Sequence, residues 1–143
     1  MENNNQTPSS APLQEQVKKK DLSLITHDMV LAILKREGGQ TEMFKEVLND
    51  YWQRCEEDAE IEIKLAKIRK APEQKSIANR ANFECTIRRH EMVVALYKKG
   101  VALITKNEIL ESLDETLRGI SQQEETHYLI ERIGKLINEL SEI

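Results

Sequence analysis

Residues 60–71 read EIEIKLAKIRKA, and Pro72 follows directly. No glycine or proline interrupts this stretch, but the sign of its charge changes halfway along: glutamates occupy the first half, and lysines and an arginine occupy the second. Pro72 disfavours the α conformation of the residue before it, whereas proline followed by an acidic residue makes a good first helical turn. The stretch therefore predicts that one helix ends and another begins near residue 72, at the tip of a helical hairpin.

The composition indicates an all-α protein. Of the 143 residues 39% are hydrophobic, 4% are aromatic and 32% are charged, which is typical of a helical bundle with an aliphatic core. A β-sandwich would need more β-branched and aromatic residues and more turn glycines. We expect a helical bundle built on a long antiparallel hairpin, with a dimer of coiled-coil character as the alternative arrangement.

The N-terminal segment differs from the rest of the chain. Residues 1–20 contain two of the three prolines and almost no large apolar side chains, so they predict a disordered tail before a single helical domain over 21–143. This segment lacks the apolar core of a signal peptide, and no window of the chain is long and apolar enough for a transmembrane helix. We therefore expect a cytoplasmic protein without a membrane partner.

Apolar residues recur at helical spacing in five segments. The first predicted helix covers 26–36 and stops at Gly38 and Gly39; the next two form the hairpin, over about 41–99. For the second arm of the hairpin we expect one buried stripe, made of Ile77, Ala81, Cys85, Met92, Val93 and Leu96.

Two C-terminal helices follow, over about 105–119 and 121–141. Thr105 and Glu108 have the spacing of a capping box, in which each side chain bonds the other residue's backbone N–H. Gly119 predicts a stop, and Ser121 with Glu124 forms a second capping box. The last helix carries a regular apolar seam, which we expect to be buried in the same bundle or, alternatively, to mediate self-association in a homo-oligomer: Leu129, Ile133, Leu136 and Leu140.

Charge is distributed in blocks along the chain. Residues 41–63 carry a net charge of -6, residues 64–99 one of +7, and residues 100–143 one of -5. In a folded hairpin the acids of 56–62 would face the region of Arg80, Arg88 and Arg89, which favours the antiparallel register, but the basic tip would stay unneutralised. A solvated tip is the simplest interpretation. The candidate partner-binding residues are Lys64, Lys67, Arg69, Lys70, Lys75, Arg88, Arg89 and Trp52.

Motifs for catalysis or metal binding are scarce. Glu124 and His127 have the Glu-x-x-His spacing of di-iron bundles, but such a site needs two of these motifs. Cys55 and Cys85, even with His90, fall short of the four ligands of structural zinc, and we expect them to be buried, inert thiols. No glycine-rich phosphate loop or nucleophile elbow is present. We expect neither an enzyme nor a bound cofactor or metal.

These observations favour a non-catalytic protein–protein interaction module, which would act as an adaptor, regulator or chaperone-like binder through helix surfaces. An apolar seam would supply affinity, and the charge blocks would select the partner. The alternative is a nucleic-acid-associated accessory protein that uses the basic segment 64–89. That segment lacks interleaved aromatic residues for stacking on bases, which disfavours this alternative.

Overall fold

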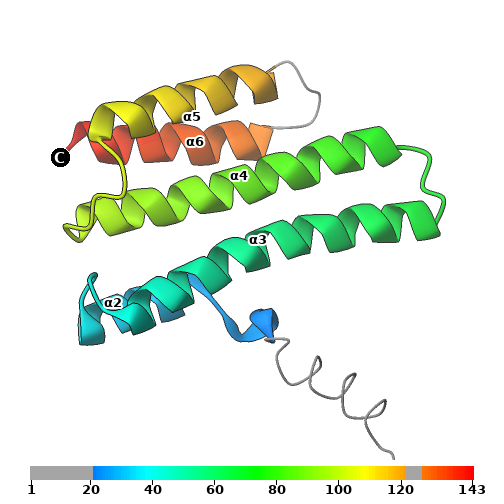
Figure 1. Cartoon of the computed structure of the whole chain (residues 1–143). Helices are drawn as coiled ribbons and strands as arrows, with labels where there is room; N and C mark the ends of the chain where they lie inside the picture. Colours follow the sequence, from blue (N-terminus) through cyan, green and yellow to red (C-terminus); the bar gives the residue numbers. More distant parts are fainter. Residues whose placement is uncertain (1–20, 122–126) are drawn as a thin grey trace, which may run out of the picture.

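Figure 1 shows the computed structural model of the chain, in which residues 21–121 and 127–143 are described; all their regular elements are helices. This confirms the predicted all-α class, while the expected tail over 1–20 lies outside the described residues. The elements are a 3-10 turn and five α-helices: η1 (Leu22–Leu24), α2 (His27–Glu37), α3 (Glu42–Ile68), α4 (Gln74–Lys98), α5 (Lys106–Ser121) and α6 (His127–Ser141).

Threonine caps begin three of the helices. The hydroxyl oxygens of Thr26 and Thr41 accept hydrogen bonds from the backbone N–H three residues further on, at 3.1 and 3.2 Å, and so start α2 and α3. The predicted capping box of α5 is confirmed. The backbone N–H of Glu108 donates to Thr105 Oγ1 at 3.1 Å, and the N–H of Thr105 donates to Glu108 Oε1 at 3.0 Å.

The helices α3 and α4 lie side by side and run in opposite directions, with residues 69–73 as the connection (Figure 1). Two hydrogen bonds close the end of α3: the N–H of Ala71 donates to the Ala66 carbonyl at 3.0 Å, and that of Lys70 donates to the Lys67 carbonyl at 3.1 Å. This pair of bonds is a Schellman motif, which places Lys70 in the left-handed region with φ 52°. Pro72 follows the motif, as is common after such a cap.

The helix α4 separates two apolar clusters, because α3 packs on one side of it and α5 and α6 pack on another (Figure 1). Met92 and Leu96 belong to the cluster with η1, α2 and α3, whereas Ile87 and Val94 belong to the cluster with α5 and α6. The single stripe predicted for this arm was therefore incomplete. It omitted the second buried face, and Val93, which it included, packs on the α5 and α6 side.

The helix α5 does not stop at Gly119, as the sequence predicted, but continues to Ser121. A Cβ at Gly119 would lie 3.4 Å from Cε1 of Phe83, an ordinary van der Waals distance, so this position faces the aromatic ring of α4 from within the helix. The predicted stop at Gly119 was wrong because the chain stays helical for two residues beyond it. The second predicted capping box involves Glu124, which lies outside the described residues.

The apolar seam of α6 is buried within the chain. Leu129, Ile133 and Leu140 have no exposed surface and Leu136 is 5% exposed, and all four pack in the cluster with α4 and α5. The same-bundle arrangement therefore accounts for this seam. The four side chains leave no apolar surface for a second copy.

Candidate functional site

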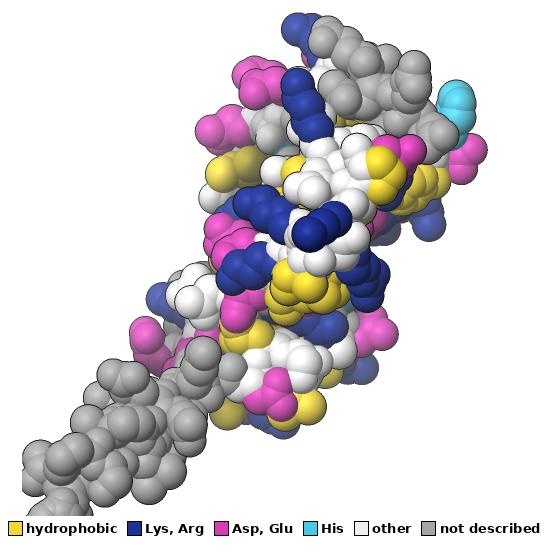
Figure 2. All heavy atoms as spheres, turned by 90° about the vertical axis from the view of Figure 1, so that its right-hand side faces the viewer, with side chains coloured by type: hydrophobic (Ala, Val, Ile, Leu, Met, Phe, Trp, Pro, Cys, Tyr) yellow, Lys and Arg dark blue, Asp and Glu magenta, His cyan; other side chains and the backbone are white. Residues whose placement is uncertain are grey.

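The predicted basic residues of the tip gather at one end of the molecule. Lys64 and Lys67 end α3, Arg69 and Lys70 lie in the connection, and Lys75 lies in the first turn of α4; all five are exposed. Figure 2 shows this end of the hairpin facing the viewer, with hydrophobic side chains between the Lys and Arg side chains. The tip is therefore a mixed surface, both basic and apolar.

The apolar part of this surface was missed by the sequence analysis. Ile61, Leu65 and Ile68 are 55%, 40% and 75% exposed. Their spacing of four and three residues aligns them along one side of α3, and we call these three residues the outer row. At 100° per residue the row points nearly opposite to Ala59 and Ala66, which are buried. The signal for it was present in the stretch 60–71, as a second apolar stripe on the other side of the helix from the buried one.

The acids and bases beside the outer row have no ion-pair partner among the described residues. Glu60 and Glu62 flank its N-terminal end, while Lys67 and Arg69 flank its C-terminal end, and all four are exposed. The hairpin neutralises its charges elsewhere: within the described part of the chain, Asp58 is the acid of α3 that forms an ion pair with α4. The outer row therefore has an acidic end and a basic end, and both are open to solvent.

The remaining predicted partner-binding residues lie midway along the hairpin, away from the tip. Arg88 Nη1 lies 2.8 Å from Asp58 Oδ2, so this arginine ties α4 to α3. The guanidinium of Arg89 lies 5.6 Å from the centroid of the Trp52 ring, a cation–π contact between the two helices. Trp52 is half-buried against the apolar cluster of α2 and α3. The structure thus brings five of the eight candidates together at the tip, while these three form contacts between α3 and α4 away from it, with Arg89 exposed and the other two half-buried.

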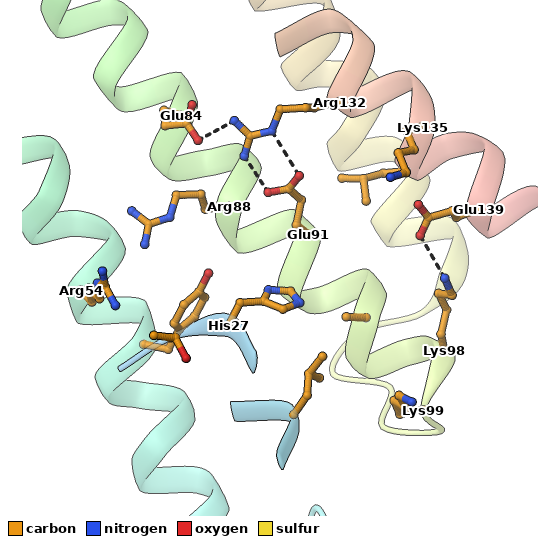
Figure 3. A pocket seen from close by; sticks show the side chains of 15 residues that line it. His27, Arg54, Glu84, Arg88, Glu91, Lys98, Lys99, Arg132, Lys135 and Glu139 are labelled. Carbon is orange, nitrogen blue, oxygen red and sulfur yellow. Dashed lines mark hydrogen bonds and ion pairs between the residues drawn. The ribbon is translucent and has the colours of Figure 1, made fainter. Parts of the chain in front are cut away.

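An open groove of about 890 Å³ lies between the N-terminus of α2 and the helices α3, α4 and α6 (Figure 3). In its centre Arg132 of α6 bridges two glutamates of α4: Nη1 lies 2.5 Å from Glu84 Oε2, and Nη2 lies 2.6 Å from Glu91 Oε1. These hydrogen bonds raise the pKa of Arg132 above its usual value. Nearby, Lys98 Nζ lies 3.1 Å from Glu139 Oε1. Every glutamate of the groove is therefore held by a cation of the groove itself.

The other side of the groove carries Arg54 and Arg88 (Figure 3). These two arginines share the carboxylate of Asp58, which lies outside the groove lining. Arg54 also donates a hydrogen bond to the carbonyl of Ile25, which joins η1 to α3. The groove was not predictable from local patterns, since its lining comes from four helices. Its charges mostly satisfy one another, so we assign them to holding α2, α4 and α6 in place.

The titratable residues in the described part of the chain are arranged for packing. His90 Nδ1 lies 2.8 Å from the Thr86 carbonyl and Nε2 lies 2.6 Å from Ser112 Oγ, a pattern that fits a neutral ring donating to the carbonyl. Burial lowers the pKa of His90, and it raises the pKa of the thiols of Cys55 and Cys85, which keeps them protonated.

No group of three or more His, Cys, Asp or Glu side chains in residues 21–121 and 127–143 could hold a metal ion. The candidate motif at Glu124 and His127 falls largely outside those ranges. None of the described helices is long and apolar enough to cross a membrane. Comparisons with protein-family models, curated proteins and solved structures found no match for the chain.

Proposed function

We propose that the chain is a non-catalytic protein-binding module, an adaptor, regulator or chaperone-like binder, and that the outer row at the hairpin tip is its binding surface. The observation that carries this proposal is the exposure of Ile61, Leu65 and Ile68 on one side of α3. Isolated exposed apolar residues are ordinary, but three in a helical row match the face that helices present to partners.

The interior of the hairpin near the tip supports the same proposal. There Ala59 and Ala66 of α3 and Ala81 of α4 are buried and Ile63 and Ile77 are half-buried, while the three larger aliphatic side chains of the outer row point outward. A hairpin optimised only for its own stability would bury the large side chains and expose the small ones. A conflict of this kind is expected where a surface serves binding.

The area of the outer row sets the scale of the interaction. The three exposed fractions amount to less than two whole side chains, worth roughly 3 to 5 kcal/mol if a partner covered them completely. Association itself costs about 4 kcal/mol or more, so further contacts must contribute. The charged residues beside the row are suited to that role, and they would make association faster and more selective.

The exposed outer row also argues against the alternative that the tip binds nucleic acid. A phosphate backbone passing over the lysines of the tip would meet the aliphatic outer row and the acids Glu60 and Glu62, which repel phosphate. A direct check is the binding of labelled single- and double-stranded DNA and RNA at low salt. Binding that falls steeply as salt rises would favour this alternative over protein binding.

The test of the proposal compares variants of the full chain as bait in an extract of its native cells. Leu65→Gln with Ile68→Gln removes apolar surface at the tip but keeps helix-forming side chains. The matched control, Leu24→Gln with Ile143→Gln, changes two apolar residues outside the tip whose combined exposure is similar; they are 68% and 55% exposed, against 40% and 75% for Leu65 and Ile68. We expect proteins captured by the wild-type chain and by the control to be lost with the tip variant. Equal capture by all three proteins would overturn the proposal.

A further inference from the structure

The outer row is acidic at one end and basic at the other, so its charges can be paired by a second copy of the chain. Glu60 and Glu62 precede Leu65, the middle residue of the row, and Lys67 and Arg69 follow it. None of these four residues forms an ion pair with another described residue. When two such helices lie antiparallel, the acidic end of one meets the basic end of the other. The charges of two copies of the row are therefore complementary when the helices are antiparallel, and not when they are parallel.

Helix geometry fixes which residues would meet. At 100° per residue, Glu62 and Arg69 lie on one edge of the row, and Glu60 and Lys67 lie on the other side, beyond Lys64. In a two-fold symmetric antiparallel pair, a given edge faces the same edge of the other copy. Glu62 therefore pairs with Arg69 of the second copy, and Glu60 lies on the same side as Lys67 of the second copy, where the two attract at longer range; each pair occurs twice.

We infer that two copies of the chain associate through their outer rows, as an antiparallel, two-fold symmetric dimer at the hairpin tips. Ile61 of each copy then packs against Ile68 of the other, and Leu65 lies next to the symmetry axis. The interface rests on the proposed function, because it uses the same binding surface. It is separate from the seam of α6, which is already buried.

Among the described residues there is room for this arrangement. The outer row faces away from the side of α3 that packs on α4. The helix α2 packs at the N-terminal end of α3, and η1 lies near the middle of α3 (Figure 1). The second copy would therefore extend beyond the tip. The small apolar area predicts a weak dimer, with a dissociation constant on the order of 10 µM.

The proposed antiparallel register brings one pair of like charges together, and this contact gives a separate test of the register. Lys64 lies beside the middle of the row, so the two copies of Lys64 approach each other near the axis, where like charges repel. Replacing this residue with the neutral Lys64→Gln should strengthen association severalfold. A weaker dimer in this variant would overturn the register.

The decisive experiment uses two charge-swapped variants of the full chain. The first, Glu60→Lys with Glu62→Lys, makes the row basic throughout; the second, Lys67→Glu with Arg69→Glu, makes it acidic throughout. All four residues are exposed, so the fold should persist, which circular dichroism would check. Molar mass is measured by light scattering or sedimentation from about 1 to 300 µM, a range that brackets the expected constant.

We expect wild-type chain to show dimers at the upper concentrations, each variant alone to remain monomeric, and their equimolar mixture to recover the dimer. In the mixture all four pairs are attractive again: two have the wild-type sign and two have the reversed sign. A monomeric wild-type chain over the whole range, a mixture that does not associate, or a variant that dimerises alone as well as wild type does would each overturn the inference. If the wild-type chain is monomeric yet the tip variant loses captured proteins, the inference fails while the proposed function stands.

Discussion

Replacing Lys70 with glycine should stabilise the protein, because this lysine occupies a position where a side chain is unfavourable. Its φ of 52° lies in the left-handed region, at the position after the helix where glycine is most often found. A side chain in this conformation costs roughly 1 to 2 kcal/mol. Glycine would remove that cost but would lose part of the gain, about 0.5 to 1 kcal/mol, through its greater freedom in the unfolded chain.

The expected net effect of Lys70→Gly is a gain of about 0.5 to 1 kcal/mol in the free energy of unfolding. For a chain of this length, that corresponds to a rise of about 2 to 4 °C in melting temperature. Chemical denaturation followed by circular dichroism can resolve the difference. The hydrogen bonds of Lys70 and Ala71 to the end of α3 involve only the backbone, so both remain available in the variant.

The matched control is Lys70→Ala, which removes the same charge and the same long side chain but keeps the Cβ. Any effect of lost charge at the end of α3 appears in both variants, so the difference between them isolates the backbone conformation. If Lys70→Gly is no more stable than Lys70→Ala, the left-handed conformation, and with it the described geometry of the tip, would be refuted.

Three further predictions concern the body of the molecule. Arg132→Met should cost roughly 1 to 2 kcal/mol, since it leaves two half-buried glutamates of α4 without a cation; denaturation in high salt should show a smaller loss. Ile87→Ala should cost about 3 kcal/mol because the side chain is fully buried between α4 and the C-terminal helices, whereas Ile68→Ala should change unfolding by less than about 0.5 kcal/mol. The lowered pKa of His90 means that the unfolded chain binds its proton first as pH falls, so this residue should stabilise the fold fully above about pH 6.5 and less below it. His90→Gln should remove that part of the pH dependence of the free energy of unfolding. If the pH dependence is the same in the variant and in the wild-type chain, the role assigned to His90 is wrong.

The predictions that succeeded depended on local chemistry. The bonds of Thr105 and Glu108 span three residues, so the sequence specifies them without knowledge of the rest of the fold. Gly119 shows the limit of such reasoning. Whether a glycine ends a helix or lies within it depends on what surrounds it, and the neighbour of Gly119 is Phe83 of α4, which is distant in sequence.

The two buried faces of α4 were beyond the sequence analysis for a similar reason. With Ile87 and Val94 on one side and Met92 and Leu96 on the other, its apolar residues are spread around the helix, and only the docking of neighbouring helices decides which face each belongs to. The outer row, in contrast, was predictable. Its three residues lie within twelve consecutive positions at helical spacing, on the opposite side of the helix from Ala59 and Ala66.

The change of charge sign along residues 60–71 has two consequences in the folded chain. The ion pair between Asp58 and Arg88 shows how acids of α3 can be neutralised by α4. Closer to the tip this neutralisation ends, since the second arm offers few acids opposite the lysines, and the large aliphatic side chains of the outer row point outward. The fully buried side chains of the tip are alanines, and Ile63 and Ile77 are only half-buried. The tip therefore contributes little apolar burial of its own, and its geometry depends on the backbone cap at Lys70 and on the helices behind it. Charged ends and an apolar middle, exposed on such a tip, are poorly explained by the stability of the hairpin alone and are well explained by a binding surface that specifies the direction of its partner.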